Sequence, residues 1–97
     1  MKISEVTDKI IASFIREDDL TDEDIKLLSI IKSAAKAYIV EHTALTMSQL
    51  DEHEDLTIAY LILVEDMYDN RAMAVNYTNS NRTVETILSM HAMNHVG

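Results

Sequence analysis

Hydrophobic and polar positions recur with helical spacing along most of the chain and predict four helices. The most informative segment, residues 51–71, has an acidic start, seven unbroken apolar residues at 58–64, and a polar end at Tyr68-Asp69-Asn70-Arg71. A helix that is apolar on nearly every side needs more than one packing partner. In so short a chain, another copy of the protein can be one of those partners, so this helix is a candidate subunit interface.

Capping signals mark the starts of the two longest predicted helices. Asp51 with Glu54 has the spacing of a capping box, in which two side chains satisfy the exposed N–H groups of a first helical turn. Thr21 with Asp24 has the same spacing and predicts a helix that runs to about residue 41. The broad apolar face of that helix consists of Leu27, Leu28, Ile31, Ala34, Ala35, Tyr38 and Ile39.

Shorter helices are predicted at the two ends of the chain. The first spans about residues 4–15, and its apolar stripe consists of Ile3, Val6, Ile10 and Phe14, with Ile11 and Ile15 beside it. The last follows a cap within Asn79-Ser80-Asn81, and its apolar face consists of Val84, Ile87, Leu88 and His91. Residues 71–80 alternate with a period of two, which indicates an extended arm or short strand. The predicted fold is therefore all-α, one domain of about four helices with an arm between the third and the fourth.

The composition agrees with helices throughout and excludes several classes of site. The 97 residues include no Cys, no Pro and a single Gly, so disulfides, thiolate metal sites and glycine-rich phosphate loops are excluded. No apolar run approaches the roughly 20 residues needed to cross a bilayer. The N-terminus lacks the apolar core of a secretory signal, so we expect a protein made and kept in the cytoplasm, without a membrane partner.

The charge is strongly negative and unevenly distributed. The formal net charge is −9, and sixteen of the seventeen acidic residues precede Asn70. Negative charge repels phosphate and argues against autonomous nucleic-acid binding, which needs cations to displace counterions. Neither long helix has a basic exposed face, so a DNA-reading helix-turn-helix is not expected.

Three polar clusters could carry chemistry, and for each of them a structural role is favoured. His91 and His95 share a helix face at metal-binding spacing, but no further ligand pattern accompanies them. The acidic run at 17–24 lacks the Gly and the distal Glu of a calcium loop. The carboxylates at 51–55 form a helix start where all are expected to be exposed. Since no Gly-x-Ser-x-Gly elbow is present either, neither an enzyme nor a cofactor is expected.

Four segments, taken in order, carry a resemblance to a known family. The first is Arg16-Glu17-Asp18-Asp19-Leu20 with Asp22-Glu23-Asp24-Ile25, and the second is Ala34-Ala35-Lys36-Ala37-Tyr38-Ile39 with Thr43-Ala44-Leu45. The third runs from Leu61-Ile62-Leu63-Val64 to Tyr68-Asp69-Asn70-Arg71, and the fourth is Val84-Glu85-Thr86-Ile87-Leu88. In combination they resemble the head–tail connector (adaptor) proteins of tailed bacteriophages, also called DNA-packaging proteins.

The chain departs from the family pattern at a few positions. Many members have Thr-Gly where this chain has Thr43-Ala44, and Glu where it has Asp69. Many also have a Pro before the third helix and another before the last, whereas this chain has none. These departures concern mainly the ends of the third and fourth helices.

The resemblance implies a non-enzymatic structural protein at the head–tail junction of the virion. Subunits of such proteins form a homo-oligomeric ring, expected to be dodecameric in the virion, beneath the portal protein of the filled head. The ring extends the DNA channel and offers a docking surface for the stopper or tail-completion protein. DNA is expected to pass through an acidic lumen without sequence-specific binding.

Two sets of residues are candidates for contacts in such a ring. The predicted subunit interface consists of Ile58, Leu61, Ile62, Tyr68, Arg71, Val75 and Tyr77. The less acidic C-terminal part is predicted to contact the portal, because Met adapts to irregular surfaces; the candidates are Met90, His91, Met93 and His95. For Arg71 two interpretations stay open, a contact with the dipole at its own helix end or with an acidic surface of a neighbouring copy.

Two other functions compete with the connector ring. The first is a small acidic helical regulator or antitoxin-like module that binds a basic protein partner. The other is a small enzyme or metal-binding bundle, which the absent motifs disfavour.

Overall fold

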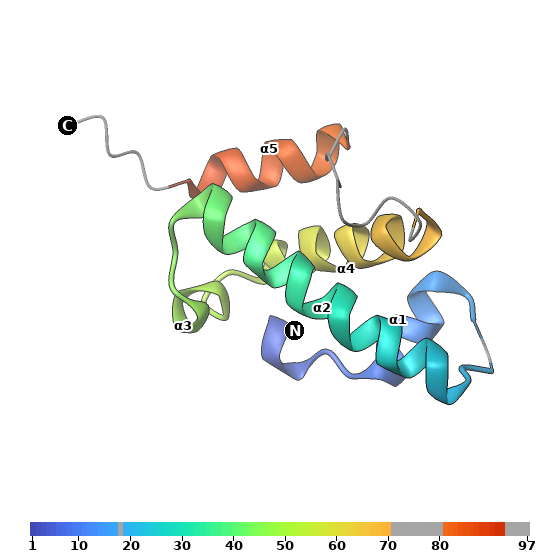
Figure 1. Ribbon diagram of the computed structural model, residues 1–97. Helices are drawn as coiled ribbons and strands as arrows, with labels where there is room; N and C mark the ends of the chain where they lie inside the picture. The colour runs from blue at the N-terminus through green and yellow to red at the C-terminus, as the bar shows by residue number, and fades with distance from the viewer. Residues whose placement is uncertain (18, 71–80, 93–97) are drawn as a thin grey trace.

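The computed structural model describes residues 1–17, 19–70 and 81–92. Throughout these segments every regular element is helical and no strand occurs, which confirms the predicted all-α fold (Figure 1). The arm predicted at 71–80 lies outside the described residues. In chain order, the elements are the 3-10 turn η1 (Ile3–Glu5) and the helices α1 (Asp8–Ile15), α2 (Asp22–Thr43), α3 (Met47–Leu50), α4 (Glu54–Asp69) and α5 (Arg82–His91).

Helix α4 is the central element of the bundle. It packs against α2, α5, α1 and η1, and in Figure 1 α5 and the N-terminal segment lie on different sides of it. Its buried residues are Leu56, Thr57, Ala59, Tyr60, Leu63, Val64, Met67 and Tyr68. They join the buried face of α2, formed by Leu28, Ile31, Ala35 and Ile39, in one hydrophobic cluster. Because a fully buried aliphatic or aromatic side chain contributes about 1.5–3 kcal/mol, this cluster is the main source of stability.

Side-chain caps at the starts of α2 and α5 confirm two predicted helix boundaries. The Thr21 hydroxyl accepts a hydrogen bond from the Asp24 N–H at 3.1 Å, and the Thr21 N–H donates to the Asp24 carboxylate at 3.1 Å. The Asn81 side chain accepts from the Val84 N–H at 3.1 Å. On α5, Val84 and Leu88 are buried and Ile87 and His91 partly buried, as their spacing predicted.

The capping box predicted for Asp51 and Glu54 is wrong. Helix α4 begins with His53 at its N-cap position, and that side chain makes no capping hydrogen bond. Asp51 instead ends the short helix α3, and its carboxylate accepts a hydrogen bond from the Ser4 N–H at 3.1 Å. Hydrogen bonds from Ser4 hold the pKa of Asp51 below its ordinary value. The carboxylate therefore fastens the N-terminal segment to the bundle.

The first helix starts later than predicted. Residues 3–5 form a separate turn, and Thr7 caps α1 by accepting a hydrogen bond from the Ile10 N–H at 3.3 Å. This break resets the helical phase, so the predicted stripe is not continuous. Ile3 and Ile11 are buried, whereas the side chain of Phe14 is 39% exposed.

Helix α2 also differs from its prediction in detail. It continues to Thr43, whose hydroxyl donates to the Ile39 carbonyl at 2.7 Å and accepts from the Leu45 N–H at 3.2 Å. Ala34, predicted on the apolar face, is exposed, and Ile30 is 67% exposed. Within the described segments, no helix combines the length and hydropathy needed to cross a membrane.

The backbone conformation of the residue that follows α2 can be tested by substitution. Ala44 follows the helix in the left-handed region, with φ 59° and ψ 17°, where a Cβ atom costs about 1 kcal/mol relative to glycine. Ala44→Gly is therefore expected to raise the free energy of unfolding by about 0.5–1 kcal/mol, measured by urea unfolding followed by circular dichroism. The matched control Ala37→Gly, at an exposed position inside α2, is expected to lower it by about 1 kcal/mol. A loss of stability in both variants would contradict the left-handed backbone conformation of Ala44.

Candidate assembly surfaces

The predicted interface residues on α4 form an apolar strip that the chain covers only in part. Ile58 is 53% exposed, while Leu61 and Ile62 are partly buried against the core. We call these three residues the α4 strip. Their helical spacing places them on the outer side of α4, opposite its buried residues Tyr60, Leu63 and Met67. The strip is therefore available to a partner.

The N-terminal segment extends this surface. Met1 is 51% exposed and lines an open pocket of about 310 Å³ with Glu54, Thr57, Ile58 and Leu61. The Thr57 hydroxyl donates a hydrogen bond to the Met1 carbonyl at 2.6 Å and holds the segment against α4. Sequence reasoning missed Met1, since a residue before the first helix carries no periodic signal.

Carboxylates border the α4 strip. Glu54 lies four residues before Ile58, and Glu65 and Asp69 lie seven and eleven residues after it. These spacings place all three carboxylates on the outer side of the helix. The strip thus combines an apolar centre with a border of carboxylates, of which Glu54 is paired with the N-terminal ammonium of Met1 at 3.0 Å, so the net negative charge of the border comes from Glu65 and Asp69. Two such strips facing each other would bring like charges together, which disfavours a symmetric pairing of the same surface.

The remaining predicted interface residues are placed differently. Tyr68 is 6% exposed and belongs to the hydrophobic core of its own chain, so little of its side chain can reach a neighbour. Arg71, Val75 and Tyr77 lie outside the described residues. The strip and the N-terminal segment are therefore the described parts of the predicted interface.

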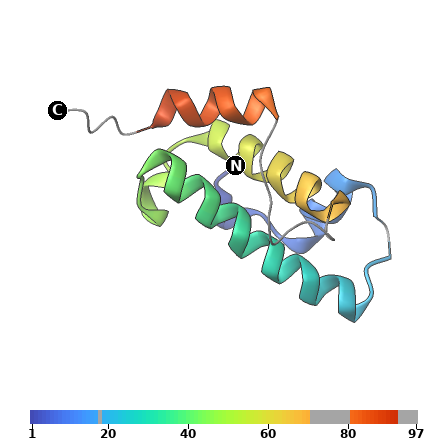
Figure 2. The same ribbon diagram turned by 45° about the horizontal axis from the view of Figure 1, so that its top comes forward.

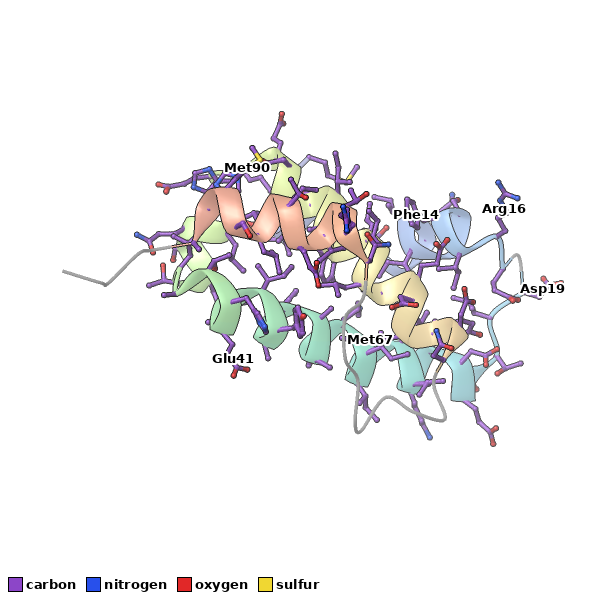
Figure 3. The ribbon with its side chains drawn as sticks, turned by 90° about the horizontal axis from the view of Figure 1, so that it is seen from above. Phe14, Arg16, Asp19, Glu41, Met67 and Met90 are labelled. Carbon is purple, nitrogen blue, oxygen red and sulfur yellow. The ribbon has the colours of Figure 1, made fainter. Side chains whose placement is uncertain are left out.

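Two of the predicted portal-contacting residues lie at the end of α5, and one side chain is exposed whereas the other is hydrogen-bonded. Met90 is 69% exposed on α5 (Figure 3). It borders an open depression of about 550 Å³. His91 is directed at its own chain, with its Nε2 atom 2.6 Å from a carboxylate oxygen of Asp55 and its ring 4.2 Å from that of His53. Met93 and His95 lie outside the described residues.

The contact between His91 and Asp55 ties the end of α5 to the start of α4. Burial opposes ionisation of Asp55, but the hydrogen bond and the charge of His91 outweigh it, so the pKa of Asp55 lies below its ordinary value. Among the described residues, no group of three His, Cys, Asp or Glu side chains is placed to hold a metal ion. The geometry of this cluster is that of a clasp between two helices.

Comparison of the chain with family models, with curated protein sequences and with solved structures found no match.

The clasp gives a prediction about pH. Since the pKa of Asp55 is lowered in the folded chain, its carboxylate stabilises the fold above the unfolded value of about 3.9 and loses this effect as the pH falls through the folded value. Asp55→Asn is expected to lower the free energy of unfolding at pH 7 by about 0.5–1 kcal/mol, the range for partly exposed ion pairs. The difference from the unsubstituted chain should shrink below about pH 4, measured by urea unfolding at each pH.

The control for this prediction is Glu52→Gln, which removes an exposed carboxylate of the same neighbourhood. It should change stability little at either pH. An Asp55→Asn effect that is equal at pH 7 and pH 3 would mean that the charge of Asp55 contributes nothing.

Proposed function

We propose that this chain is a non-enzymatic subunit of a head–tail connector ring, located at the head–tail junction of a tailed bacteriophage. The resemblance of four segments, in order along nearly the whole chain, supports this function. One backbone feature supports it too. Ala44 stands where many connector proteins have glycine, and its backbone is in the left-handed conformation that favours glycine.

The α4 strip is the observation that carries the assembly part of the proposal. Complete burial of a fully exposed Ile side chain contributes roughly 1.5–3 kcal/mol to the free energy of association. Ile58 can contribute the part of this that corresponds to its exposed fraction. A stable interface buries about 1,200 Å² or more in total, far more than one side chain offers. In this proposal the strip and Met1 form the centre of the interface, and Arg71, Val75 and Tyr77 contribute the rest.

The acidic border favours a head-to-tail arrangement of subunits. A two-fold contact would place the border of one α4 strip against the same border of its neighbour, with repulsion between carboxylates. A heterologous contact instead joins the strip to a different surface of the next copy. Repeated by a rotation that closes, such a contact generates a ring.

Other parts of the chain are assigned to the remaining contacts of the ring. Met90, exposed on α5, is the described candidate for the portal contact, and His91 contributes less because its ring is held by Asp55. Met93 and His95 are proposed to extend that contact. The acidic character of the first seventy residues suits a lumen through which DNA slides without binding.

A small acidic regulator that binds a basic protein is the second candidate. The acidic border of the α4 strip favours it, because carboxylates around an apolar centre complement a partner with apolar and basic side chains. The mass of the purified protein separates the two candidates. A large closed ring, or a monomer that assembles on a portal, supports the connector; a tight complex with a basic protein supports the regulator.

Substitution of Ile58 tests the interface. Ile58→Ser is expected to weaken each subunit contact about four- to fifteenfold, because about half of an Ile side chain is no longer buried as apolar surface. Sedimentation velocity of the chain, alone and with a portal protein, measures the loss of the assembled species. The control Ile30→Ser removes an even more exposed Ile, 67% against 53%, from α2 and should leave assembly intact. Equal assembly of both variants would remove the α4 strip from the interface.

Arg71 gives a separate test, from the sequence alone. If its guanidinium meets an acidic surface of a neighbouring copy, Arg71→Glu replaces attraction by repulsion and should weaken ring formation. Light scattering measures the mass of the assembled species. Unchanged assembly would exclude Arg71 from the interface and leave its interaction with the helix end as the remaining interpretation.

A further inference from the structure

The C-terminal ends of α2 and α5 converge on a second pocket, away from the α4 strip. The two helix ends lie side by side in Figures 1 and 2, and α2 and α5 are in contact. The pocket has a volume of about 280 Å³ and is lined by Tyr38, His42, Glu85, Leu88, Ser89 and Ala92. Since pockets for drug-sized ligands begin at about 300 Å³, this one suits a single side chain better than a larger ligand.

One wall of the pocket is an aromatic pair. The rings of Tyr38 and His42 stack with their centroids 4.0 Å apart and their planes inclined by 20°. The His42 Nδ1 atom lies 2.9 Å from the Tyr38 carbonyl oxygen. A carbonyl oxygen only accepts, so Nδ1 donates, and in the neutral ring Nε2 remains an acceptor. The wall therefore presents π-electron surface and a nitrogen lone pair, both of which attract cations.

The opposite wall is negative. Glu85 is exposed, and its carboxylate has no hydrogen bond or ion pair with any residue in the described part of the chain. Helices α2 and α5 end at Thr43 and His91, so the negative ends of two helix dipoles point to the same region. The nearest cation on the facing part of α2, Lys36, lies over the ring of Tyr60. Among the described residues, the pocket itself is lined by no lysine or arginine, and Arg82, one turn before Glu85, lines the neighbouring depression.

We propose that this pocket binds the guanidinium group of an arginine from a different protein. A planar guanidinium stacks on aromatic rings and forms paired hydrogen bonds with a carboxylate, whereas a lysine ammonium does neither as well. Glu85 supplies the carboxylate, Tyr38 and His42 supply the stacking surface, and Leu88 contacts the aliphatic stem of the arginine. The site is separate from the α4 strip and does not depend on the proposed ring.

A foreign arginine fits this site better than one from a second copy. Each copy carries a net charge of −9, so two copies repel each other over this surface. Arg16 is followed directly by Glu17 and, two positions further, by Asp19, and these carboxylates would approach Glu85 together with it. Arg82 lies on α5 itself, one turn before Glu85, and Arg71, which the proposed ring already uses, has Asp69 two positions before it. The occupant is therefore a segment that carries arginine without acidic neighbours.

The test is a titration of the full chain with acetyl-Gly-Arg-Gly-amide in 150 mM salt, followed by the NMR signals of the Tyr38 and His42 rings and of the Ser89 amide. Saturable shifts of these signals are expected. The matched peptide with citrulline, which has the same shape without charge, should bind at least threefold more weakly. Glu85→Gln should weaken binding of the arginine peptide by a similar factor. The control Glu23→Gln, about 28 Å away along α2, should not change it.

Three outcomes would overturn the proposal. Equal binding of the arginine and citrulline peptides would exclude recognition of the charge. Shifts spread over all acidic surfaces, unchanged by Glu85→Gln, would mean nonspecific attraction. Sedimentation velocity provides the third: if Glu85→Gln abolishes self-association of the chain, the occupant is a second copy rather than another protein. Circular dichroism of each variant verifies that the helices are retained.

Discussion

Contact between α2 and α4 is the interaction on which the arrangement of the other elements depends. The buried residues of α2 recur every three or four positions and cover one side of α4, which leaves the other sides of α4 to α5, α1 and η1. These elements are short, and a chain of 97 residues has little surface with which to enclose an apolar helix completely. Ile58 is the position where this coverage ends. An exposed apolar strip is thus a consequence of how the core is built.

Local interactions could be predicted from the sequence, and interactions between distant segments could not. Thr21 and Asn81 cap their helices through hydrogen bonds to residues three positions away, so their spacing was sufficient. Asp51 had the same kind of signal, but its carboxylate is bonded to Ser4, 47 residues away in sequence. The phase of α1 was mistaken for the same reason, because Ile3 reaches the core from a separate turn rather than from the helix.

For the candidate surfaces, too, the features that depend on local sequence could be predicted and those that depend on distant segments could not. The unbroken apolar run predicted that some of its residues would lack cover, since no single face of a helix holds seven consecutive residues. The packing of α5 and the N-terminal segment decides which of these residues is exposed. In the structure that residue is Ile58. Tyr68, an equally reasonable candidate by composition, is enclosed because α4 stays in the core to its last turns. The pocket with Tyr38 and Glu85 joins residues of two helices far apart in the chain, so its one local signal was the four-residue spacing of Tyr38 and His42.

Charge connects the two proposed surfaces and also distinguishes them. At the α4 strip the carboxylates form a border, and the free energy of association comes from the apolar centre, which salt does not screen. At the α2–α5 pocket the carboxylate and the aromatic rings are themselves the binding groups, so attraction weakens as ionic strength rises. A chain of net charge −9 gains little from electrostatic contact with its own copies and much from contact with a basic partner. The proposed self-association through the strip and the proposed recognition of an arginine in the pocket therefore depend on different interactions, and neither requires the other.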